Sequence, residues 1–103
     1  MATVRKDFDA YKIFYYSGFT YEALIECFKD GALVGRMVFF KEGQVPPNKN
    51  YASGPSIHYS LDRFDDIITT LRHEKPLFLF LNLDTLSGML ATSELEPTGE
   101  EEG

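Results

Sequence analysis

The residues best suited to chemistry in this sequence are two histidines, one cysteine and two adjacent aspartates. Cys27 could act as a nucleophile only if His58 came close to it in the folded chain. A lone cysteine in an apolar segment is more often a small core residue. His73 falls near the end of an expected helix, where a positive charge suits the helix dipole. Asp65 and Asp66 diverge by about 100° on that helix, which is poor geometry for a paired-carboxylate site.

The sequence contains none of the motifs that are typical of metal and phosphate sites. The histidines lack HExxH spacing, and one cysteine cannot form a CxxC pair. No glycine-rich loop follows an expected strand and opens a helix. We therefore expect no catalytic residue, no metal and no cofactor. A small hydrolase or lyase working through His58 stays open, and a pocket lined by His58 and a carboxylate would favour it.

Five residues are candidates for a binding surface: Arg36, Lys41, Lys49, Tyr51 and His58. The first two fall on an expected strand, and Lys49 and Tyr51 fall on the loop that follows it. Exposed aromatic side chains of a sheet can stack nucleobases while cations at its edge hold phosphates. The alternative is that the cations are ordinary solvated residues, because the folded part of the chain is not basic.

The charge of the chain is concentrated at its C-terminal end. The formal net charge is −6, from 16 acidic and 10 basic residues. Five glutamates and no basic residue lie at 94–103, which leaves 11 acids against 10 bases and a net charge of −1 for residues 1–93. We expect residues 1–93 to form a single domain and 94–103 to be a disordered acidic tail. That tail could compete with nucleic acid for the cationic residues.

One stretch of the sequence predicts an amphipathic helix. Ser60 can cap its N-terminus, and Pro76 cannot continue it. Tyr59 and Phe64 have the spacing of a hydrophobic staple around such a cap. Apolar residues recur at spacings of three and four and form one stripe: Leu61, Phe64, Ile67, Ile68 and Leu71. The stripe needs an apolar surface to lie on.

Strand-forming residues gather in six other segments: 10–16, 19–29, 32–41, 57–59, 77–83 and 89–92. Between the second and third, Asp30-Gly31 suits a type I′ hairpin. Residues 1–8 are polar and expected to fray at their start, and 42–56 to form one long loop that is either functional or mobile. Four strands, one helix and two strands predict an α+β fold, in which a curved antiparallel sheet carries the helix on one face.

The expected strands are apolar on both sides, although one helix covers only one face of a sheet. We therefore expect a homodimer that buries the second face. A half-barrel that closes on itself is the alternative.

The longest apolar run, residues 77–81, is too short to cross a bilayer. The N-terminus shows no secretory signal, and a single cysteine fits a reducing compartment, so we expect a cytoplasmic protein without a membrane partner.

Two resemblances can be drawn. The segment Leu71-Arg72-His73-Glu74-Lys75-Pro76, an apolar strand and Glu96-Pro97-Thr98-Gly99-Glu100 resemble small uncharacterised bacterial proteins that share an L-R-N-E-K-P and E-P-x-G-E pattern. That likeness covers about the last third of the chain and implies no function. In element order the chain is similar to the single-stranded nucleic-acid-binding proteins of the PC4, Whirly and PUR families, and the strands after the helix depart from their simplest form.

The interpretation that we favour is a small non-enzymatic binding domain of unknown ligand that forms a homodimer. The alternative, implied by the second resemblance, is a regulatory protein that binds single-stranded nucleic acid. Binding that weakens as salt rises would favour this alternative.

Overall fold

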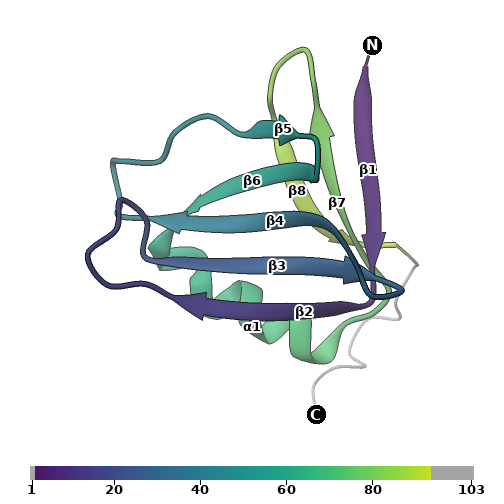
Figure 1. The fold of residues 1–103 in the computed structure, drawn as a ribbon, viewed down its shortest axis with the longest axis horizontal. Coiled ribbons are helices and arrows are strands. Elements are labelled where there is room, and N and C mark those ends of the chain that lie inside the picture. The colour runs from purple at the N-terminus through teal and green to yellow at the C-terminus, as the bar shows by residue number, and fades with distance from the viewer. Residues whose placement is uncertain (1, 94–103) are drawn as a thin grey trace.

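The computed structural model describes residues 2–93, which form two sheets and one α-helix (Figure 1). The acidic segment 94–103 lies outside the described residues, and so does Met1. The strands are β1 (Thr3–Phe8), β2 (Ala10–Tyr15), β3 (Ala23–Lys29), β4 (Ala32–Phe40), β5 (Lys49–Tyr51), β6 (Gly54–Ser60), β7 (Leu77–Asn82) and β8 (Gly88–Thr92). The α+β class is confirmed. The predicted order of elements is not, because six strands precede the helix, and the predicted single curved sheet is instead two sheets.

The larger sheet has the strand order β2-β3-β4-β6-β5. Its first three strands form an antiparallel meander, as predicted. Asp30 and Gly31 join β3 to β4, and both have positive φ angles, 52° and 83°. Positive φ at both central residues is the requirement of a type I′ turn. This confirms the hairpin prediction, and the predicted strand 19–29 is a strand from Ala23 to Lys29.

The predicted long loop 42–56 is wrong in two respects. Residues Lys49–Tyr51 form the edge strand β5, and β6 begins at Gly54 rather than at residue 57. The strands β4 and β6 are parallel, whereas an all-antiparallel sheet was expected. The chain reaches this parallel position because β5 turns back and pairs antiparallel with β6. The segment is rich in proline, glycine and asparagine, which are typical of turns. Its composition therefore predicts a loop and does not indicate the three-residue strand.

The smaller sheet has the order β1-β7-β8 and is antiparallel. No strand was predicted in residues 1–8, but Thr3–Phe8 pair with β7 along its whole length; fraying was expected only at the start of this segment, and Met1 lies outside the described residues. β1 is a charged edge strand, and charges on an edge discourage pairing with other chains. Arg5 lies with its guanidinium carbon 3.8 Å from the ring centre of Phe78, and it also pairs with Asp7 at 2.9 Å.

The predicted helix is confirmed, with a shorter regular part. A 3₁₀ turn, Leu61–Arg63, precedes α1 (Phe64–His73). Ser60 stands at the predicted N-cap position with extended backbone angles, but its hydroxyl makes no capping hydrogen bond. Of the predicted stripe, Ile67, Ile68 and Leu71 are buried, whereas Leu61 is 39% exposed. The 3₁₀ turn places Leu61 away from the stripe, since three residues per turn do not keep a 3.6-residue period.

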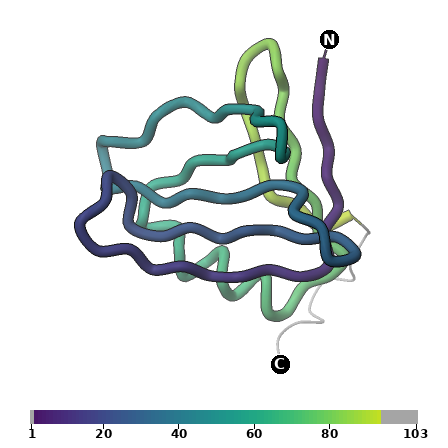
Figure 2. The backbone as a smooth tube through the Cα atoms, in the orientation of Figure 1, coloured from purple at the N-terminus to yellow at the C-terminus, as the bar shows by residue number. Residues whose placement is uncertain are grey.

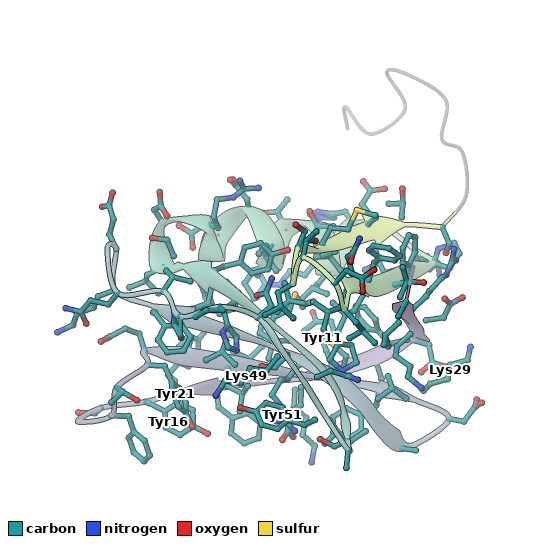
Figure 3. The ribbon with its side chains drawn as sticks, turned by 90° about the horizontal axis from the view of Figure 1, so that it is seen from above. Tyr11, Tyr16, Tyr21, Lys29, Lys49 and Tyr51 are labelled. Carbon is teal, nitrogen blue, oxygen red and sulfur yellow. The ribbon has the colours of Figure 1, made fainter. Side chains whose placement is uncertain are left out.

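The helix and the smaller sheet cover the same face of the larger sheet, here called the inner face, and the main core lies between them (Figure 3). Fully buried side chains come from both sheets, among them Ile25, Met37, Phe39, Ile57 and Leu79. Tyr59 and Phe64, predicted to form a staple, both pack on the ring of Phe39, with ring centres 5.9 and 5.0 Å from it. No helix within residues 2–93 is long and apolar enough to cross a membrane.

The opposite, outer face of the larger sheet carries a second apolar cluster. Leu24, Val38 and Phe40 are 9%, 6% and 9% exposed, and the rings of Phe14, Tyr16 and Tyr21 pack against them. The helix covers one face only, as expected. The protein's own aromatic rings cover much of the apolar surface on the other face, so the homodimer stays a prediction.

Candidate ligand-binding groove

One row of polar side chains crosses all five strands of the larger sheet. Lys12 is the register partner of Glu26, and Glu26 is the partner of Arg36. Ser56 of β6 has Arg36 as its partner on one side and Lys49 of β5 on the other. Directly opposite residues of paired strands lie on the same face of a sheet. We call this set the polar row; it lies on the outer face, because the intervening strand positions supply the main core.

A groove of about 300 Å³ opens over the polar row. Its floor is the outer face of β3, β4 and β6. One wall is the segment that leads into β5, and the other is the turn between β2 and β3; both leave the same end of the sheet (Figure 2). The groove is lined by Thr20, Tyr21, Leu24, Glu26, Arg36, Val38, Phe40, Pro46, Lys49, Tyr51, Ser56 and His58. Tyr21 and Tyr51, from the two walls, lie on the side of the sheet away from the helix (Figure 3).

Four of the five predicted binding residues line this groove: Arg36, Lys49, Tyr51 and His58. Lys41 does not line it, because it follows the end of β4 and is exposed. The sequence analysis missed Ser56 and Glu26. Both lie in strands at the two-residue spacing that puts them on the face of His58 and Leu24, and this period is the signal that could have identified them.

His58 holds the wall of the groove to its floor. Its backbone N–H donates to Asn48 Oδ1 at 2.6 Å, and Nδ1 lies 3.2 Å from the carbonyl oxygen of Pro46. A carbonyl only accepts, so Nδ1 carries the proton. Nε2 then accepts from the Ser56 hydroxyl at 2.9 Å. The ring also meets Phe40 edge-on at 5.2 Å.

Burial lowers the pKa of His58 below its usual 6.5, the hydrogen bonds to Pro46 and Pro47 oppose this, and the charge of Lys49 adds to the lowering. The unfolded chain therefore binds the proton more readily than the folded one.

We expect the contribution of His58 to the free energy of unfolding to be fully present above about pH 6.5. This contribution should be lost as the pH falls from there through the pKa of His58 in the folded state. Urea unfolding at several pH values measures this. His58→Gln should remove that part of the slope and His73→Gln should keep it; equal slopes in all three proteins would contradict the assignment.

The two cations of the groove are held differently. Arg36 Nη2 donates to Ser53 Oγ at 2.8 Å, and the guanidinium carbon lies 5.3 Å from the ring centre of Tyr51. Lys49 is exposed. Within residues 2–93, neither Arg36 nor Lys49 forms an ion pair with a carboxylate. Two positive charges therefore face the groove without a partner of opposite charge at salt-bridge distance.

The condition set for an enzyme is met, because His58 and the carboxylate of Glu26 line the same groove. The Ser56 hydroxyl also donates to His58, the polarity of an activated serine. However, Ser56 is only 1% exposed, which places its hydroxyl in the floor rather than in front of a substrate. The arrangement therefore suits binding better than nucleophilic attack.

Cys27 does not meet the condition for a nucleophile. It is buried in the main core, on the inner face, whereas the His58 ring lies on the outer face. Burial, with a smaller contribution from the charge of Glu26, raises the pKa of the thiol to about 12. A thiol that stays protonated is a poor nucleophile. Within the described part of the chain, histidine, cysteine and acidic residues form no cluster of three that could hold a metal ion.

The chain matches no known protein family, no curated protein and no solved structure. The resemblances to small bacterial proteins and to the PC4, Whirly and PUR families therefore stay predictions.

Proposed function

We propose that this protein is a non-enzymatic binding domain and that the groove on the outer sheet face is its binding site. The observation that carries the proposal is that Arg36, Lys49, Tyr51 and His58, from three strands, line one concave site. Concave sites with an apolar floor and a few convergent polar groups are the usual places for small ligands. Here the floor has an apolar part, Leu24, Val38 and Phe40, beside the polar row.

A fragment screen observed through the backbone amide resonances of the whole chain tests this proposal. Compounds that bind should shift resonances of residues lining the groove rather than those of the helix or the smaller sheet. Tyr51→Ala removes one wall and should weaken the binding of groove compounds. Tyr15→Ala is the matched control, because Tyr15 is 73% exposed and does not line the groove. Compounds that gather on another surface, or that bind both variants as they bind the unmodified protein, would refute the proposal.

Single-stranded nucleic acid is the second candidate ligand. Phe19, in the turn between β2 and β3, and Tyr51, at the end of β5, are 58% and 45% exposed and could each stack a base. Lys12, Arg36 and Lys49 share the outer face with one carboxylate of the polar row, Glu26. A fluorescence-polarisation titration with single-stranded DNA and RNA at about 50 and about 200 mM salt separates the candidates. Salt-sensitive binding supports nucleic acid, and its absence at micromolar protein removes it.

The homodimer through a sheet face is also proposed. The outer face is the one left for a second copy, since the helix and the smaller sheet cover the inner face. Such a dimer would cover the groove. Light scattering on the samples of the fragment screen, which reports the oligomeric state, therefore shows whether a bound compound prevents a second copy from binding.

A further inference from the structure

We propose that the groove takes a small molecule that carries one anionic group, a phosphate or a carboxylate, on a flat aromatic ring. This inference rests on the binding function proposed above and adds the chemistry of the ligand. It follows from the two halves of the groove, which differ in character along the strands: one half contains the polar row, and the other has an apolar floor with the ring of Tyr21 packed against it.

The polar half offers a place for one anion. Arg36 and Lys49 are the register partners of the same residue, Ser56, on its two sides. Neighbouring strands lie about 4.8 Å apart, so the Cα atoms of the two cations are roughly 10 Å apart. Side chains of this length can reach one group placed above Ser56. Charge-assisted hydrogen bonds from a guanidinium and an ammonium are the strong ones in anion recognition.

The charge balance of the groove favours a single negative charge. Arg36 and Lys49 face the groove together with one carboxylate, that of Glu26. The half-buried ring of His58 makes the two hydrogen bonds of the neutral form, and burial lowers its pKa below the usual 6.5, so we count no charge for it near neutral pH. The lining therefore carries one net positive charge. A carboxylate matches this charge, whereas a phosphate monoester carries about 1.5 to 2 negative charges near neutral pH, part of which would stay uncompensated beside Glu26; we therefore expect the carboxylate to be the preferred group.

The apolar half offers a place for a ring. One step further along the strands, about 7 Å from the polar row, the floor changes to Leu24 and Val38, and Phe40 follows. Tyr21 stands over this floor with its ring 5.9 Å from that of Phe40, edge to face. Aromatic pairs prefer offset or edge-to-face contact, so a flat ring packs against Tyr21 and Phe40 better than a bulky saturated group does. The short step from cations to floor suits a ring that bears its anionic group directly or through one carbon.

The experiment uses the whole chain and five probes, observed through the backbone amide resonances. Phenylacetate and phenyl phosphate carry both features, and we expect both to shift the resonances of the groove. Phenylacetamide lacks the charge, cyclohexylacetate lacks the flat ring, and inorganic phosphate lacks the ring altogether. We expect these three to bind about tenfold more weakly or worse, the loss typical of one missing charge-assisted contact or ring contact. The tighter of the two phenyl compounds identifies the phosphate or the carboxylate as the preferred group.

Two lysines supply the matched variants. Lys49→Glu puts a negative charge in the groove and should weaken phenylacetate by about tenfold or more. Lys41→Glu makes the same change on an exposed residue outside the groove and should leave the affinity unchanged. Arg36→Gln is the second groove variant, and the dispersion of the amide spectrum shows that each variant is folded. Equal losses in the two glutamate variants would overturn the inference.

The outcomes separate this inference from the function on which it rests. If phenylacetamide or cyclohexylacetate binds the groove as tightly as phenylacetate, the groove is a binding site and the stated ligand class is wrong. If neither a fragment nor an oligonucleotide shifts the groove resonances, the proposed function and the inference both fail.

Discussion

Gly54→Ala is expected to prevent stable folding. Gly54 begins β6 with a φ angle of +125°, which side-chain-bearing residues rarely adopt. A Cβ atom there would overlap the carbonyl group of Val34 and come within 3.1 Å of Gly35 Cα. Both neighbours are backbone of β4 and cannot move aside without breaking the sheet. Strain and overlap together should cost more than about 4 kcal/mol, a large part of the stability of a domain of this size.

Urea unfolding followed by circular dichroism measures this loss. Gly43→Ala is the matched control, because Gly43 also has a positive φ, +81°, but open space where its Cβ would stand. It should cost only about 1–2 kcal/mol, the strain of a left-handed backbone. Similar midpoints for the two variants would show that β4 and β6 do not approach as closely as described.

Phe39→Ala should be the most damaging core truncation. Phe39 lies on the inner face, next to the last residue of the central strand β4, and is fully buried. Its ring contacts Tyr59 of β6 and Phe64 at the start of α1, so it joins the sheet to the helix. Removing it leaves a cavity and releases both rings. We expect a loss of about 3–5 kcal/mol in the free energy of unfolding.

The control is Phe19→Ala, which removes a ring of the same size from an outer-face loop. Phe19 is 58% exposed and packs on Tyr16 with ring centres 4.6 Å apart. It should cost no more than about 1 kcal/mol. Thermal or urea unfolding of both variants tests the contrast; equal losses would mean that the helix does not dock through Phe39.

Local signals predicted the elements that they act on directly. Asp30-Gly31 identified a hairpin because few dipeptides accept positive φ at both positions. The helix was predicted correctly because the stripe through Ile67, Ile68 and Leu71 has a helical period and a buried face. Its end before Pro76 followed from the missing amide hydrogen of proline.

Elements that depend on distant partners could not be predicted in the same way. β1 is polar in sequence, and it is a strand because β7 presents a free edge more than seventy residues later. The parallel pairing of β4 with β6 depends on the path through β5, a strand of three exposed residues. Neither partner can be read from the composition of the segment itself.

The candidate site shows the same division. Arg36, Lys49, Tyr51 and His58 were singled out for their residue types, and the structure brings them to one groove. Lys41 was singled out on equal grounds and lies elsewhere. The difference comes from the register of the strands. Ser56 pairs with both Arg36 and Lys49, and this pairing assembles the polar row. The register of parallel strands is set by the whole sheet.

The pairing of β1 with β7 also determines when the domain can be completed during synthesis. Thr3 to Phe8 are made before the other described strands, but their partners, Leu77 to Asn82, are among the last described residues to be made. All strands of the larger sheet have been made once the chain reaches Ser60. At that point β7 has not been made, so the backbone groups of β1 have no partner strand. Closing so long a loop is entropically costly and slow. Of the two sheets, we therefore expect the smaller one to form last, and β1 to be fixed in place late in folding although it is made before the other described strands.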